Sequence, residues 1–416
     1  MKISVFLASI QKSIIHIFDR PIKVGIGGVI FAALFIGARV VVAAHGHLAA
    51  LVLAGTYHVN ATQTPHGLPI VPGQGYDGQF YYRMSINPFN FHRTYQGITM
   101  DTSGRYQRIV YPLLAWIFSF GNYSLVPWAL VGINVIGIGL LSFLGAKIAV
   151  HSNRTPLIGF GFALYFGFVM TLSRDLTEIV EAVFLIATLY LLLKNRPILA
   201  GCSGAIAVLA KEPTVIVILG IGATVIARHM LNSRLRSKLD RLFYTPDISE
   251  ASGPVSLVDH TIWLIPLLAF VSWQVYLQSK LGKFPILSVS GHNAGVPLVG
   301  FLEGLRAYMN SLSSPTTLLW IVELLLLIYT GFLTVRHFRS SSSPIEFKVA
   351  FVFVFLSTLF LQKIVWIGAA DFRMLDDLFI LCLVILVQSR LQLKPILVSL
   401  GTITTIAAAQ GVLRLD

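Results

Sequence analysis

The sequence predicts an all-α polytopic membrane protein with about 11 transmembrane helices and a long loop after the first of them. Hydrophobic residues make up 55% of the 416 residues, and charged residues only 12%, about half of the roughly 25% typical of soluble domains. Apolar runs of about 20 residues, the length that crosses a bilayer, recur along the chain. No segment shows the polar–apolar alternation over about ten residues that a transmembrane barrel requires.

The N-terminal segment differs from the apolar runs, because charged side chains are interspersed among apolar ones near helical spacing. Such a segment is typical of an amphipathic helix on the membrane surface, and we expect residues 1–21 to lie on the cytoplasmic side. No small-residue cleavage site follows a short apolar core, so the segment does not resemble a cleavable signal. The first span is expected at Ile22–Ala44.

The long loop after this span, which runs to Arg108, is rich in glycine and proline. Loops of this length are uncommon and are often functional. Its most distinctive stretch is Gly75–Arg83, where Asp77 lies beside glycines that permit a tight turn close to a ligand. Aromatic rings at Tyr76, Phe80, Tyr81 and Tyr82 suit stacking on a sugar, and they equally suit the membrane interface.

The remainder of the chain predicts a surface helix and ten further spans. The segment Ile109–Gly121 is apolar but short, so we expect it on the membrane surface. The spans are expected at Ser124–Ala146, Pro156–Leu172, Leu176–Leu193, Ile198–Ala210, from there to Ala227, and at Thr261–Gln278, Pro315–Val335, Phe347–Ile367, Leu375–Val387 and Pro395–Val412. The three short spans after Leu172 are the weakest part of this topology, because losing one would invert everything after it.

Basic residues set the expected orientation. With the N-terminus inside, Lys and Arg concentrate on the inner side and most acidic residues fall outside. The net charge of +13 therefore indicates topology rather than nucleic-acid binding. We divide the chain into a cytoplasmic segment 1–21, a catalytic module 22–230 with outer loop 45–123, a basic cytoplasmic loop 231–256 and a C-terminal module 257–416. A bacterial inner membrane is the expected location.

Several charged residues meet on the outer face in this orientation, next to apolar runs where charge is costly and faces a cavity or another charge. Arg174, Glu178 and Glu181 are spaced to share one face of a helix. Carboxylates together with guanidinium and ammonium groups suit a lipid-linked phosphate and a hydroxylic substrate. The residues concerned are Asp77, Arg83, Arg105, Arg108, Arg174, Asp175, Glu178, Glu181, Lys211, Glu212, Lys280, Lys283, Asp371, Arg373, Asp376 and Asp377.

Purely structural roles account for the same residues and stay open at this point. Asp175–Glu178 resembles a helix capping box, and Lys211–Pro213 a turn between two short helices. Arg105 and Arg108 suit headgroup anchors, and Asp77 a turn residue. The segment 371–377 also fits a solvated loop.

Neither histidine nor cysteine predicts a cofactor site. Cys202 and Cys382 lie in apolar runs without a CxxC pattern. The histidines of the first outer loop match no standard metal-binding spacing; they are His45, His47, His58, His66 and His92. We therefore expect no cofactor, with a divalent metal as the less favoured alternative.

The order of these features resembles the GT-C superfamily of integral membrane glycosyltransferases. It comprises one span, an outer loop with Tyr76–Gly78, a surface helix with Tyr111–Leu114, a glycine-rich span, Arg174–Glu178 opening an apolar span, and short spans joined at Ala210–Pro213. The resemblance covers roughly residues 20–230, and the C-terminal third matches only as further spans.

The resemblance implies a polyprenyl-phosphate-linked sugar as donor and inverting transfer on the extracytoplasmic side to a glycan, lipid or protein acceptor. Asp77 would be the general base. Many members have an acidic pair there, but Gly78 follows Asp77, so Asp175 or Glu178 would supply the second acid. Arg105, Arg108, Arg174 and Lys211 would hold the donor phosphate. Tyr76, Gln79, Tyr81, Tyr82 and Glu212 would contact sugar or acceptor.

Two other classes of protein fit the composition. A transporter or flippase for a lipid-linked or anionic substrate would often show internal repeats with broken helices in corresponding positions, and no convincing repeat is visible. A non-catalytic subunit of an envelope-assembly complex would use the long loop to bind a partner. Covalent transfer of a labelled sugar separates the first interpretation from both.

Overall fold

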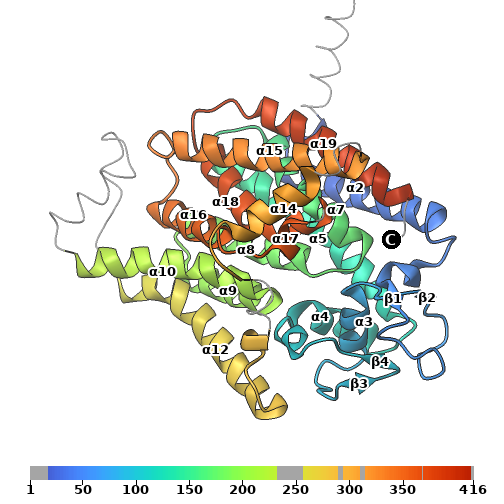
Figure 1. The fold of residues 1–416 in the computed structure, drawn as a ribbon. Helices are drawn as coiled ribbons and strands as arrows, with labels where there is room; N and C mark the ends of the chain where they lie inside the picture. The colour runs from blue at the N-terminus through green and yellow to red at the C-terminus, as the bar shows by residue number, and fades with distance from the viewer. Residues whose placement is uncertain (1–16, 232–255, 289–293, 310–313, 368, 414–416) are drawn as a thin grey trace, which may run out of the picture.

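The computed structural model describes residues 17–231, 256–288, 294–309, 314–367 and 369–413. This part of the chain is largely helical, and its strands are two residues long (Figure 1). Residues 1–16 of the expected amphipathic segment 1–21 lie outside the described residues. The expected basic loop 231–256 also lies outside them, apart from its two end residues.

Six helices in the described part of the chain are long and apolar enough to cross a bilayer, or seven if one bent pair forms a span. They correspond to six of the expected spans. The count of about 11 spans is not confirmed. The six are α2 (Pro21–Val42), α5 (Val126–His151), η4 with α10 (Glu212–Thr214 and Val215–Met230), η6 with α12 (Leu257–His260 and Thr261–Leu281), α15 (Pro315–Arg336) and α19 (Lys394–Leu413).

The other expected spans are shorter helices. The segment expected as one span at Phe347–Ile367 divides into two pieces, because the backbone leaves the helix after Thr358. All of α18 is buried, so this short helix lies in the core of the molecule. These helices are α8 (Glu178–Leu193), α9 (Pro197–Ala210), α16 (Ile345–Thr358), α17 (Lys363–Trp366) and α18 (Asp376–Val387). Helix α14 (Val299–Met309) lies where no span was expected.

The span expected at Pro156–Leu172 is not straight. It consists of η3 (Pro156–Gly159), α6 (Phe160–Ala163) and α7 (Phe166–Ser173), with a bend of 58°. The break falls at Tyr165, whose backbone is extended. Its ring stacks on Phe379 at a centroid distance of 4.6 Å, and its hydroxyl donates to the carbonyl of Phe372. These contacts with the C-terminal part hold Tyr165 out of the helix.

The segment between α2 and α5 forms a small body beside the helices (Figure 1). Strands β1 and β2 are parallel, and β3 and β4 form an antiparallel pair. The expected surface helix is α4, which buries Tyr111 and Ala115 and exposes Phe118. The elements are η1 (Leu48–Val52), β1 (Ala54–Gly55), β2 (Ile70–Val71), α3 (Gly78–Ile86), β3 (Thr94–Tyr95), β4 (Ile98–Thr99), η2 (Ser103–Gln107) and α4 (Val110–Ser119).

The C-terminal part returns to pack against the N-terminal helices. Helix α18 contacts α8, α15 and α16, and the 3-10 helix η7 (Ala369–Leu375) contacts α7 and α17. This packing brings residues 373–377 beside the start of α8. The C-terminal module expected from the sequence therefore contributes directly to the region around Asp77.

Candidate active site

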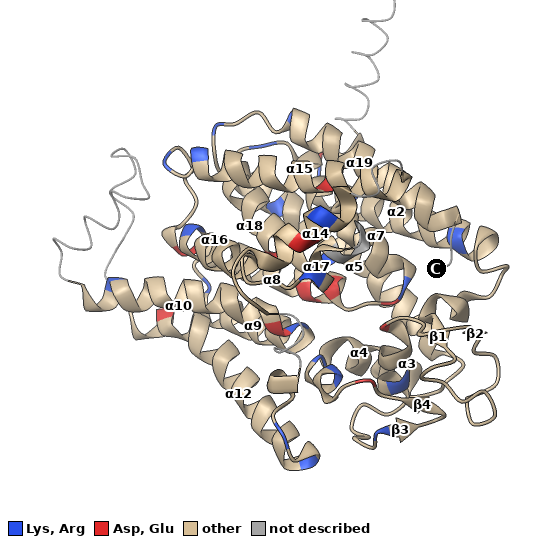
Figure 2. Cartoon of the chain, in the orientation of Figure 1, with Lys and Arg blue, Asp and Glu red and all other residues tan. Residues whose placement is uncertain are grey.

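A cavity of about 1230 Å³ is lined by the segment that contains Asp77 and by parts of the C-terminal half. Five basic side chains line it, against two acidic ones, so its lining carries an excess of positive charge. Charged residues of both signs gather around this region, between α4, α9 and α17 (Figure 2). The basic residues are Arg93, Arg105, Arg108, Lys283 and Arg373, and the acidic ones are Asp77 and Asp101.

Tight backbone packing places Asp77 in this lining, at the N-terminus of α3. Gly75 has a φ of +64°, and a Cβ there would lie 2.4 Å from the carbonyl oxygen of Leu53. A Cβ at Gly78 would lie 2.4 Å from the carbonyl oxygen of Arg174. This close approach leaves no room for a second acidic side chain directly after Asp77.

The Asp77 carboxylate is held by two arginines. Its Oδ2 lies 2.8 Å from Arg105 Nη1 and 3.3 Å from Arg373 Nη2. Burial acts to raise the pKa of Asp77, but the positive charges of Arg105 and Arg373 outweigh burial and hold that pKa well below its usual value. Asp77 is therefore an ion-paired carboxylate in this arrangement, with 17% of its side chain exposed.

Arg373 links Asp77 to Glu178. Its Nη1 donates to Glu178 Oε1 while its Nη2 faces Asp77, and the Glu178 side chain is fully buried. Arg373 is among the charges expected on the outer face, but no role was predicted for it. In the sequence, Arg373 and Arg174 look alike, because each is an arginine between apolar segments. Only the fold shows that Arg373, and not Arg174, lines the cavity.

The second cation pair at the cavity joins Arg108 to Glu212. Arg108 Nε and Nη2 each donate to a Glu212 carboxylate oxygen at 2.7 Å, which is the bidentate geometry of strong arginine–carboxylate pairs. Arg108 Nη1 lies 3.4 Å from the Tyr81 hydroxyl. Arg108 lines the cavity, whereas Glu212 lies behind it. The pair orients Arg108 and does not resemble a headgroup anchor.

The segment before α8 is not helical as the spacing suggested. Helix α8 begins at Glu178, so the expectation that Arg174 shares a helical face with Glu178 and Glu181 is wrong. Asp175 interrupts the helix with a φ of +50°. Thr177 makes no capping bond through its side chain and instead donates to the Ala210 carbonyl at 3.1 Å, so the expected capping box is not formed either.

The structure does not bring Asp175 or Arg174 into the cavity lining. Asp175 is fully buried, and neither of its carboxylate oxygens has a hydrogen-bond partner among the described residues. The Arg174 guanidinium lies over the Tyr76 ring, 4.2 Å from its centroid, in a cation–π contact. Tyr76 itself lines the cavity, so the Tyr76 ring lies between Arg174 and the cavity.

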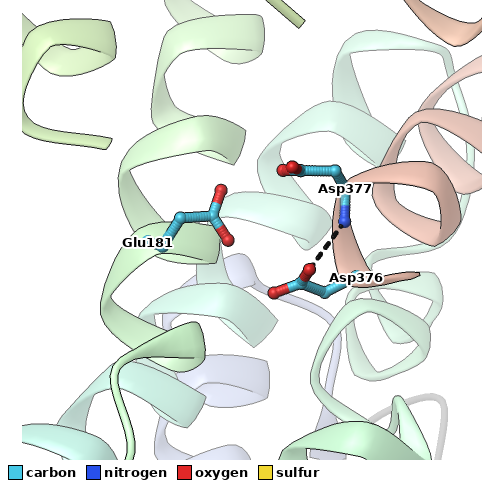
Figure 3. A group of neighbouring side chains, drawn as sticks. All are labelled: Glu181, Asp376 and Asp377. Atoms are coloured by element: carbon cyan, nitrogen blue, oxygen red, sulfur yellow. Dashed lines mark hydrogen bonds between the residues drawn. The ribbon is translucent and has the colours of Figure 1, made fainter. Parts of the chain in front are cut away.

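Lys211 also lies outside the cavity lining and is fully buried. Its Nζ lies 2.5 Å from Asp376 Oδ1. Three carboxylates gather here, which we name the carboxylate cluster: Glu181, Asp376 and Asp377. Their carboxylates point toward a common space between α8 and α18 (Figure 3).

The carboxylate cluster is acid-rich. One oxygen from each of the three residues lies within 4.8 Å of the others, and one oxygen of each has no hydrogen-bond partner among the described residues. Thr214 donates to the other Glu181 oxygen at 2.9 Å. Oxygen ligands of this kind suit a hard divalent cation, and within the described part of the chain this group alone is compact enough to hold one.

The residues expected to contact the sugar divide into two sets. Tyr76 and Gln79 line the cavity. Gln79 is nevertheless committed to the fold, because its side chain accepts from Gly55 N at 3.0 Å and donates to the Gln74 carbonyl at 2.9 Å. Tyr81 and Tyr82 are buried and do not line the cavity, and the Tyr82 hydroxyl donates to the Tyr123 carbonyl at 3.3 Å.

Comparisons with known proteins yield structural matches only. No family model matches the chain, and no curated protein matches it. Among solved structures, the chain is similar to the oligosaccharyltransferase of the archaeon Archaeoglobus fulgidus in its apo form, with a TM-score of 0.44, 12% identity, and coverage of 94% of this chain and 56% of that one. The same enzyme tethered to an acceptor peptide gives a TM-score of 0.42, 13% identity, and coverage of 94% and 55%.

A third structure, that oligosaccharyltransferase in complex with an inhibitory peptide and a dolichol-phosphate, gives a TM-score of 0.39 at 13% identity and covers 94% of this chain and 55% of that one. The chain spans just over half the length of these structures. Oligosaccharyltransferase is a GT-C membrane glycosyltransferase, the superfamily that the sequence resembles. At these identities and TM-scores, the likeness concerns the course of the chain and carries no argument about the site.

Proposed function

We propose that this chain is a membrane glycosyltransferase that moves a sugar from a polyprenyl-phosphate donor to a hydroxyl acceptor, with Asp77 as general base. One observation supports this above the others: Asp77 lines a cavity of about 1230 Å³ in which basic side chains outnumber acidic ones. A carboxylate in a cation-rich cavity provides both a proton acceptor and a binding site for a phosphate.

The proposed reaction uses these groups as follows. The acceptor oxygen attacks the anomeric carbon and its proton passes to Asp77. The bond between the anomeric carbon and the phosphate oxygen breaks, and the lipid phosphate leaves with the electron pair, so the configuration inverts. Arg105, Arg108 and Arg373 line the same cavity and would stabilise the charge on the departing phosphate. We propose no resident metal, because these guanidinium groups supply the positive charge.

We place the cavity on the extracytoplasmic side of a bacterial inner membrane, with the N-terminus in the cytoplasm. The bias of basic residues along the sequence supports this orientation. The acceptor is a glycan, lipid or protein hydroxyl. The catalytic unit includes Arg373, so it extends beyond the module 22–230 into the C-terminal half.

The test is transfer from radiolabelled short-chain polyprenyl-phosphate sugars to membrane extract, comparing the wild type with Asp77→Asn. We expect the wild type to transfer label and the variant to lose about 10²–10⁴-fold in rate, the usual effect of removing a general base. Equal transfer by both proteins would exclude Asp77 as the base. Label that crosses vesicles without becoming attached to acceptor would identify a transporter instead.

A further inference from the structure

The two arginines that hold Asp77 converge on the same carboxylate oxygen. Arg105 belongs to η2 and Arg373 to η7, and their guanidinium groups reach Asp77 Oδ2 at 2.8 Å and 3.3 Å. Both arginines line the cavity, and so does Asp77. A single negatively charged oxygen between two guanidinium groups occupies the position that an anionic oxygen of a ligand would need.

Each arginine also has a second carboxylate partner that does not depend on Asp77. Arg105 Nη2 lies 2.9 Å from Asp101 Oδ2, and Arg105 Nε lies 3.2 Å from Asp101 Oδ1. Arg373 is held by Glu178, which is fully buried. These partners would keep both guanidinium groups at the cavity when Asp77 withdraws, so the arginines are preorganised for another anion.

The ion pairs are unfavourable for a general base. A base works best when its pKa lies near the operating pH, and Asp77 is kept far below that range by Arg105 and Arg373. A phosphate offers several anionic oxygens to two guanidinium forks and matches them better than one carboxylate oxygen does. If a phosphate took the place of the Asp77 carboxylate beside Arg105 and Arg373, Asp77 would no longer face the two positive charges that lower its pKa, and it would become a stronger base.

We propose that the donor phosphate displaces Asp77 from Arg105 and Arg373, so that binding of the donor releases the base for the acceptor. This inference rests on the proposed function, and it adds an order: the donor binds first, and the acceptor is deprotonated only afterwards. In the transfer step Asp77 takes the acceptor proton while the phosphate takes the electron pair of the broken bond. Asp77 returns to the arginines after it has lost the proton to water and the lipid phosphate has left.

The exchange predicts that one substitution, Asp77→Asn, strengthens binding of the phosphate while it slows transfer of the sugar. The probe is a short-chain polyprenyl monophosphate without sugar, titrated calorimetrically into the full-length protein in detergent. We expect Asp77→Asn to bind this probe about three- to tenfold more tightly than the wild type, because the competing carboxylate is gone. Arg373→Lys should bind it about tenfold more weakly. The two terminal nitrogens of the Arg373 guanidinium contact Glu178 and Asp77 at the same time, and a single lysine ammonium cannot replace both.

Asp101→Asn is the matched control for simple loss of negative charge. Asp101 lines the same cavity and pairs with Arg105, but its removal leaves both ion pairs of Asp77 in place. We expect Asp101→Asn to bind the probe no more tightly than the wild type, because Arg105 loses the partner that keeps it at the cavity. Equal tightening by Asp101→Asn and Asp77→Asn would overturn the exchange and leave only a general charge effect.

The other outcomes also separate the two proposals. Unchanged affinity in Asp77→Asn overturns the exchange, even when the wild type transfers sugar. A wild type that transfers sugar but does not bind the monophosphate likewise overturns it, while the proposed function stands. Thermal unfolding of each variant in the same detergent shows that the protein is folded, so a loss of binding by Arg373→Lys is not mistaken for loss of structure.

Discussion

The cavity around Asp77 and the carboxylate cluster lie next to each other and differ in the balance of charge. Five basic side chains face two acidic ones in the cavity. In the carboxylate cluster three carboxylates gather, and Lys211 pairs with Asp376. One short segment serves both, because Arg373 faces the cavity whereas Asp376 and Asp377 face the interior.

This difference separates two uses of charge that look alike in the sequence. An excess of cations beside a cavity attracts an anionic ligand, and its cost is limited by partial exposure. An excess of buried carboxylates must be neutralised inside the protein by a cation or by protons. Any carboxylate that stays charged and unpaired lowers the stability of the fold. Lys211 was expected to hold phosphate, but the structure places its ammonium at Asp376, where it serves the second purpose.

The largest expected effect follows from removing Lys211. Lys211→Met leaves buried carboxylates without their ammonium, and breaking a buried ion pair in this way costs about 3–5 kcal/mol of stability. We expect a strongly lowered midpoint of thermal unfolding in detergent, partly restored by adding Asp376→Asn. Donor KM of the folded protein should be unchanged. A normal midpoint with a raised donor KM would return Lys211 to the phosphate site.

Lys283 provides the reverse case, since it is an exposed lysine that lines the cavity. Lys283→Met should leave the unfolding midpoint close to that of the wild type and raise donor KM about three- to fivefold, the range of one partly exposed ion pair. The two lysine variants therefore test the difference between the two regions: Lys211→Met should change stability but not donor KM, and Lys283→Met should change donor KM but not stability.

Arg105→Ala is expected to reduce the rate of transfer about 10²-fold, the cost of removing one group that stabilises charge in the transition state. Its pairs are partly exposed, and such pairs contribute about 0–1 kcal/mol, so the unfolding midpoint should move little. The measurement is single-turnover transfer at saturating donor, together with thermal unfolding. Undiminished turnover would remove Arg105 from the reaction.

A smaller effect concerns pH. The ion pairs lower the pKa of Asp77 in the folded protein, so the unfolded chain takes up the proton first as the pH falls. Their contribution is complete above the ordinary carboxyl pKa of about 4 and is lost as pH falls through the folded pKa. Between about pH 5 and pH 3, the wild type should lose up to about 1 kcal/mol more stability than Asp77→Asn. Parallel unfolding curves for the two proteins would contradict this.

The smallest expected effect is that of a chelator. We expect EDTA to leave transfer unchanged, because arginines in the cavity supply the positive charge that a metal would otherwise provide. Loss of transfer that Mg²⁺ or Mn²⁺ restores would contradict this expectation. A shift in the unfolding midpoint without loss of transfer would instead assign a structural cation to the carboxylate cluster.

Several helices were predictable because hydropathy is a local property. The expected spans Ile22–Ala44 and Pro315–Val335 agree with α2 and α15 to within two residues at each end. The bend at Tyr165 was not predictable, since it depends on Phe372 and Phe379, which are distant in sequence. The number of membrane crossings also depends on how short helices such as α8 and α9 pack, which composition does not specify.

The sequence by itself determined that the chain is apolar and helical, and that Asp77 lies in a turn between glycines, because hydropathy and backbone freedom are local properties. The tertiary structure decided which charges meet. It placed Arg373 on Asp77, Glu212 on Arg108 and Lys211 on Asp376. The physical reason is that an ion pair depends on distance in space, and only the packing of elements that are far apart in the sequence brings the two members of each pair together.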